Sequence, residues 1–63
     1  MEALKALIGR IWTRFDMLLD DIESTGFYVD YATEDYITVS NSKHTYTLRL
    51  AGYGNTIHIE RIE

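Results

Sequence analysis

Seven carboxylates lie in one stretch of the chain that holds no basic residue. They fall between residues 15 and 42 and are Asp16, Asp20, Asp21, Glu23, Asp30, Glu34 and Asp35. The six Lys and Arg residues all lie outside this stretch, in a chain whose net charge is −4. A module that binds DNA or RNA shows clustered Lys and Arg instead. The sequence therefore disfavours direct nucleic-acid binding and favours a protein partner with a basic surface.

Carboxylates can also hold a metal ion, and Asp16, Asp20 and Glu23 share one helix face at i, i+4 and i+7. Such triples are common on solvated helices, and a hard cation needs more oxygen ligands in a fixed geometry. The chain has no cysteine, and His44 and His58 are expected on different strands and opposite sheet faces. We therefore predict no metal site and no cofactor.

Acid–base or nucleophilic catalysis finds little support in the sequence. No serine lies in a GxSxG motif, and the Gly52–Asn55 stretch lacks the spacing of a phosphate-binding loop and predicts a hairpin turn. His58, Glu60 and Arg49 with a tyrosine could cleave RNA by acid–base chemistry, but a ribonuclease would ordinarily carry positive charge for its substrate. We expect a non-enzymatic protein and keep a small ribonuclease-like enzyme as the third hypothesis.

Three tyrosines accompany the acids in the segment YVDYATEDY, residues 28–36. Alternation along a strand predicts that Tyr28, Asp30 and Tyr36 point to solvent and that Tyr31 faces the core. Thr and Tyr are ordinary strand formers, and tyrosine is also enriched at interfaces, so a solvated sheet face and a recognition surface are both open. The predicted partner-binding residues are Asp16, Asp20, Asp21, Glu23, Tyr28, Asp30, Glu34, Asp35 and Tyr36.

Hydrophobic periodicity predicts the elements that position these residues. Apolar residues recur in steps of 4, 3, 4, 3 and 4 from Leu4 to Ile22, which predicts one helix over about residues 2–24 that stops before Gly26. Period-two alternation then predicts strands at about 27–32, 35–40, 44–51 and 56–62. The expectation is an α+β single domain, 1–63, with one long N-terminal helix packed on a four-stranded antiparallel meander.

The predicted lengths suggest a homodimer. A helix of this length spans about 34 Å, whereas strands of six or seven residues span about 20–23 Å, so the helix should overhang the sheet. An exposed apolar overhang requires a cover. The possible dimer contacts are Leu4, Leu7, Ile8, Ile11 and Trp12.

These observations lead to three functional hypotheses. The first is an inhibitor that occupies a basic, nucleic-acid-binding groove of a partner protein. In size and charge, short acidic cysteine-free α+β chains of this kind resemble the antagonists that bacteriophages make against host polymerases, restriction enzymes or CRISPR effectors. The alternative is a homo-oligomerisation or structural module. Without an apolar run long enough for a bilayer or a signal peptide at its Met1 start, the chain is expected in the cytoplasm (the host's, if phage-encoded), with no membrane partner.

Overall fold

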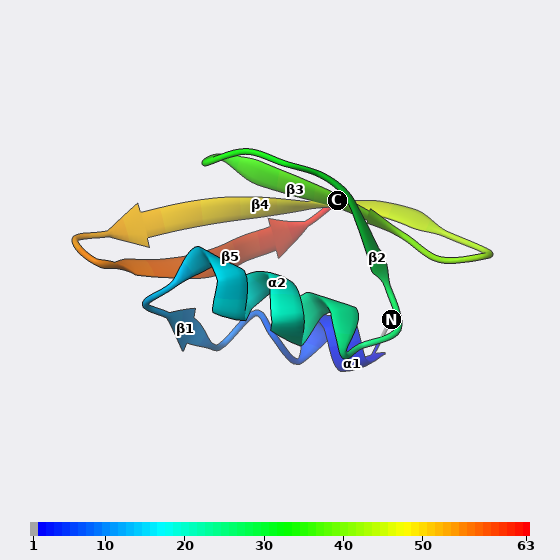
Figure 1. The fold of residues 1–63 in the computed structure, drawn as a ribbon, viewed down its shortest axis with the longest axis horizontal. Helices are drawn as coiled ribbons and strands as arrows, with labels where there is room; N and C mark the ends of the chain where they lie inside the picture. Colours follow the sequence, from blue (N-terminus) through cyan, green and yellow to red (C-terminus); the bar gives the residue numbers. More distant parts are fainter. Residues whose placement is uncertain (1) are drawn as a thin grey trace.

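The computed structural model describes residues 2–63, except for the side chain of Tyr53. The chain is an α+β fold in two layers, with helices α1 and α2 on one face of a five-stranded sheet (Figure 1). The strand order is β1-β5-β4-β3-β2, and all neighbouring strands are antiparallel. In chain order the elements are α1 (Glu2–Lys5), β1 (Ile11–Trp12), α2 (Phe15–Glu23), β2 (Tyr28–Ala32), β3 (Tyr36–Ser40), β4 (Thr45–Tyr53) and β5 (Thr56–Ile62).

The predicted long helix at 2–24 and the predicted four-stranded sheet are both wrong. The helix is interrupted after α1, and Ile11 and Trp12 form an edge strand that pairs with His58 and Ile57 of β5. Two features explain the break: Gly9 costs about 1 kcal/mol in a helix interior, and β-branched and aromatic residues such as Ile11 and Trp12 favour strands. The chain then turns back, and Arg14 is extended at φ −134° before α2 begins.

Folding back brings both helices and β1 onto one core instead of leaving an apolar overhang. Fully or almost fully buried residues come from every element except β2 and from the segments after α1 and before β2: Leu4, Leu7, Trp12, Leu18, Ile22, Phe27, Ile37, Val39, Leu48 and Ile59. Of the periodic seam over residues 4–22, Leu4, Leu18 and Ile22 are fully buried and Phe15 packs against the core, whereas Ile8 and Ile11 are exposed.

The sheet, and not the helix layer, is the longer part of the fold. Helix α2 has nine residues and spans about 13 Å, whereas the nine residues of β4 span about 30 Å. Figure 1 shows the β3–β4 and β4–β5 hairpins extending past opposite ends of α2. Part of the helix-side sheet face is consequently left uncovered, the reverse of the expected overhang.

Two irregularities set which side chains face out. The β2–β3 register shifts between Val29 and Tyr31, so that Tyr31 lies opposite Thr38, on the face of the sheet that carries no helix. Tyr31 was expected to face the core, and the bulge turns it to solvent. A second shift lies between Arg49 and Leu50, where Arg49 pairs with Arg61 and Leu50 with Ile59. Of the helices described, none is long and apolar enough to cross a membrane.

Candidate partner-binding surface

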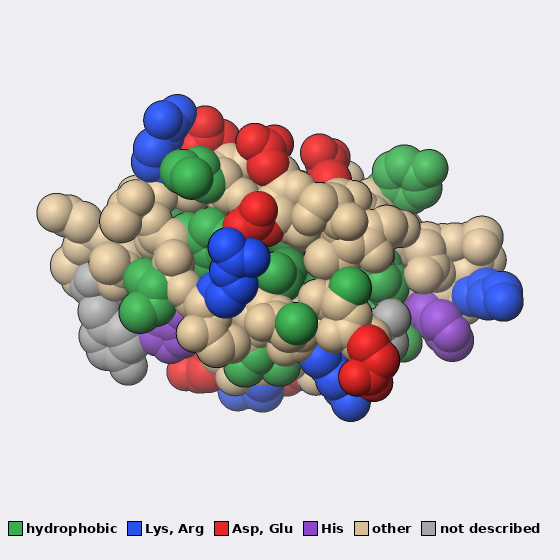
Figure 2. Space-filling view, turned by 90° about the horizontal axis from the view of Figure 1, so that it is seen from below, with side chains coloured by type: hydrophobic (Ala, Val, Ile, Leu, Met, Phe, Trp, Pro, Cys, Tyr) green, Lys and Arg blue, Asp and Glu red, His purple; other side chains and the backbone are tan. Residues whose placement is uncertain are grey.

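Helix α2 presents a row of acids to solvent. Asp16, Asp20 and Glu23 are all exposed, and Figure 2 shows acidic side chains along one border of the helix-bearing face. Asp16 forms an ion pair with Arg14, with 2.7 Å between Nη2 and Oδ2. Asp20 and Glu23 form no ion pair within residues 2–63. The last turn of α2 contains no basic residue, so these charges oppose the helix dipole without local compensation.

Asp21 differs from its neighbours because it points into the fold. The indole Nε1–H of the buried Trp12 donates a hydrogen bond of 2.7 Å to Oδ2 of Asp21. The guanidinium of Arg10 lies 3.6 Å from the same oxygen. This carboxylate ties β1 to α2, a structural contact that the sequence did not predict.

Strand β2, an edge of the sheet, carries exposed rings beside further acids. Tyr28 is 72% exposed and Tyr31 is 59% exposed, and Asp30 between them is exposed as well. Helix α2 packs against β2, which brings the helix acids and this strand to the same side of the molecule. Tyrosine is enriched at protein–protein interfaces, so two exposed rings on one strand fit a contact surface.

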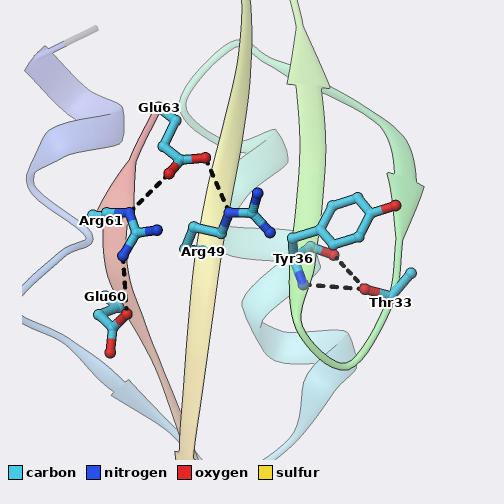
Figure 3. Close-up of polar contacts among 6 residues, drawn as sticks. All are labelled: Thr33, Tyr36, Arg49, Glu60, Arg61 and Glu63. Atoms are coloured by element: carbon cyan, nitrogen blue, oxygen red, sulfur yellow. Dashed lines mark hydrogen bonds and ion pairs between the residues drawn. The ribbon is translucent and has the colours of Figure 1, made fainter.

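The turn from β2 to β3 holds Glu34 and Asp35 in a defined conformation. The hydroxyl of Thr33 accepts hydrogen bonds from the amides of Asp35 at 3.2 Å and Tyr36 at 3.1 Å. The same hydroxyl donates to the carbonyl of Tyr36 at 3.2 Å (Figure 3). Glu34 and Asp35 are exposed and, like Asp20, form no ion pair in the described structure.

The outer sheet face, which bears no helix, has a balanced charge network that sequence reasoning missed. Glu63 accepts from Nε of Arg49 at 3.0 Å and from Nε of Arg61 at 2.8 Å (Figure 3). Arg61 also lies 3.4 Å from Glu60. The Arg49 guanidinium lies 5.5 Å from the centre of the Tyr36 ring. The pairing of Arg49 with Arg61, which follows from the β4–β5 bulge, could not be read from the sequence.

The network shifts the pKa values of two of its members, Glu63 and Arg61. Hydrogen bonds from Arg61 and then Arg49 lower the pKa of the Glu63 carboxyl below its ordinary value. The hydrogen bond to Glu63 in turn raises the pKa of Arg61. Arg49 and Arg61 are thus engaged within the sheet, and they do not neutralise the acids at the end of α2.

Tyr36 joins the two parts of this surface. Its ring lies 6.1 Å from the ring of Tyr31, measured between centroids, and is only half-buried. The unbalanced acids and the exposed tyrosines belong to one surface region made of α2, β2 and the β2–β3 turn, in which α2 packs against β2. We call it the acidic edge, and it comprises Asp20, Glu23, Tyr28, Asp30, Tyr31, Glu34 and Asp35.

The residues considered for a dimer separate into two groups. Leu4, Leu7 and Trp12 are at most 5% exposed and belong to the chain's own core. Ile8 is 38% exposed and Ile11 is 68% exposed, so only these two are accessible at the β1 side.

No group of three or more His, Cys, Asp or Glu side chains among residues 2–63 is arranged to hold a metal ion. The α2 acids that share a helix face are thus not part of such a group. The chain matches no protein-family model, no curated protein and no solved structure.

Proposed function

We propose that the protein is a non-enzymatic protein-binding module that inhibits its partner by occupying a basic, nucleic-acid-binding groove. The observation that carries the proposal is the acidic edge, where β2 exposes Tyr28, Asp30 and Tyr31 and the helix packed against this strand, α2, exposes Asp20 and Glu23. A surface that served only solubility would need the charges and not the rings. Buried tyrosines commonly dominate the binding energy of an interface, while the charge around them sets partner choice and association rate.

The sign and position of the charge define the partner. The acids of the edge form no ion pair among the described residues, so they are available to cations on another molecule. Grooves lined with many cations are typical of proteins that bind the phosphate backbone. The acidic edge would replace phosphates there, and binding would weaken as salt rises.

A ribonuclease-like activity has less support from the arrangement. Arg49, the cation that such a reaction would use, is hydrogen-bonded to Glu63 and lies over Tyr36. A homodimer is the second candidate, because Ile11 is 68% exposed on β1. Light scattering of the purified protein tests it directly, with Ile11→Lys as the variant that should abolish a dimer.

The proposed function is tested by capture from nuclease-treated lysate at low and moderate salt, with Asp30→Lys and Glu2→Lys as matched variants. Both positions are exposed and both substitutions change the net charge equally, but Glu2 lies on α1. We expect one nucleic-acid-handling protein to be retained by the parent and by Glu2→Lys. That protein should be released by added duplex oligonucleotide and lost with Asp30→Lys. Equal retention by both variants would contradict the proposal.

A further inference from the structure

Beyond the start of α2 the uncovered helix-side face of the sheet forms a cleft of about 670 Å³. This volume is in the range of ligand-binding pockets, which are about 300–1,000 Å³. The cleft lies between the β2–β3 turn, the β4–β5 hairpin and the first residue of α2, Phe15. Its apolar lining consists of Phe15, Ala32, Ala51 and Ile57, with Gly52 and Gly54.

The charged groups of the cleft are all acidic. Glu34 and Asp35 line it, and no Lys, Arg or His is found among its described lining residues. Both carboxylates are exposed and free of ion pairs in the described chain, and the Thr33 hydroxyl fixes the turn that presents them. An apolar lining with carboxylates beside it suits a ligand that has an apolar stem and a cationic head.

We propose that this cleft receives an arginine side chain of the partner protein. This inference rests on the proposed function and identifies the cleft as the site that determines its specificity. Arginine fits better than lysine for two reasons. Its planar guanidinium can donate two parallel hydrogen bonds to the carboxylate of Glu34 or Asp35, and it stacks on an aromatic face such as that of Phe15. The cleft is larger than one side chain, so the residues that flank the arginine also enter it.

The test uses the intact protein and a pair of blocked peptides, Ac-Leu-Arg-Leu-NH2 and Ac-Leu-citrulline-Leu-NH2. Citrulline has the shape of arginine without its charge, so this control leaves the protein unchanged. Each peptide is titrated into isotopically labelled protein while backbone amide shifts are followed. We expect the arginine peptide to shift the amides of Ala32, Gly52 and Ile57, and the citrulline peptide to bind at least about fivefold more weakly.

Two variants locate the interaction. Glu34→Gln/Asp35→Asn should weaken binding of the arginine peptide by about five- to tenfold, whereas Glu2→Gln, at an exposed acid on α1 outside the cleft, should leave it within twofold. Equal binding of the two peptides, shifts confined to α2, or an unchanged affinity in the double variant would overturn the inference. Because the peptide titration needs no partner and the capture experiment changes no residue of the cleft, failure of this inference can be distinguished from failure of the proposed function.

Discussion

Replacing two neighbouring acids of α2 with alanine should change stability in opposite directions. Asp20 is exposed and forms no ion pair within the described chain. Asp21 accepts the 2.7 Å hydrogen bond from the indole of Trp12 and lies 3.6 Å from Arg10. The two residues have the same side chain and lie in the same last turn of the helix. Helix propensity and the helix dipole therefore affect both alike, and the two positions differ in their tertiary contacts.

The shared terms favour alanine. Removing an acid near the helix C-terminus relieves a repulsion of about 0.3–1 kcal/mol, and alanine is the better helix former by up to about 0.7 kcal/mol. Asp20→Ala should therefore raise the free energy of unfolding by about 0.5–1.5 kcal/mol. Asp21→Ala gains the same amount but loses a hydrogen bond to a charged acceptor, and it leaves the N–H of a residue that is 4% exposed without its partner. That loss amounts to about 2–3 kcal/mol, so this variant should be less stable than the parent by about 1 kcal/mol.

Urea denaturation at low salt, followed by far-ultraviolet circular dichroism, measures both variants. Trp12 fluorescence is avoided because the substitution at Asp21 changes the surroundings of that indole. The decisive quantity is the difference between the two variants, which we expect to be about 2–3 kcal/mol. Asp21→Asn keeps an oxygen acceptor and should recover part of the loss. Equal stabilisation by both alanines would show that the Trp12–Asp21 bond contributes nothing, and the reasoning about this contact would fail.

Three further predictions, which use four substitutions, test other parts of the fold. Gly26 has φ 93°, so Gly26→Ala should lower the free energy of unfolding by about 1 kcal/mol. The control Gly9→Ala should not lower it, because no atom lies within 4 Å of the new Cβ. Thermal melts of the two variants test this difference. Leu18 is fully buried, and Leu18→Ala should lower the free energy of unfolding by about 2–5 kcal/mol. In so small a domain this loss should unfold the chain and remove the chemical-shift dispersion of its backbone amides. Because the pKa of Glu63 is lower in the folded state, its contribution to stability is present above the unfolded pKa and is lost as pH falls through the folded one. Arg61→Gln should raise the Glu63 titration midpoint measured by carbon-detected NMR, and an unmoved midpoint would contradict the assigned cause.

The end of the helix before Gly26 and the alternation of buried residues in the strands could be predicted from the sequence. The chain ends α2 at Glu23 and places Gly26 at positive φ, as the helix-stop signal predicted. Ile37 and Val39 are buried on alternate positions of β3. The alternation signal is reliable here because β3 pairs on both sides and keeps one register with β4.

The errors have a common origin in pairing across the chain. Apolar residues at helical spacing are compatible with one long helix and also with two segments that fold onto the same core. Leu4 and Leu18 are therefore buried in either case. A two-residue strand such as Ile11–Trp12 is too short to show alternation, and its existence depends on β5. The bulge between Val29 and Tyr31 likewise depends on the pairing partner, and it placed Tyr31 on the surface that the sequence had assigned to Tyr28 and Tyr36.

Because β2 is an edge strand, its acids have two possible roles, protection of the edge and recognition of a partner. The exposed tyrosines favour the second role. Exposed edge strands are templates for aggregation, and natural proteins blunt them with charges and bulges. Asp30 and the bulge beside it satisfy that requirement without further help. Protection of this kind gains nothing from Tyr28 at 72% exposure or Tyr31 at 59%, because exposed rings increase the apolar surface that the charges would guard. Under the proposed function a partner would bury the rings, and the same acids would limit self-association and select a basic surface.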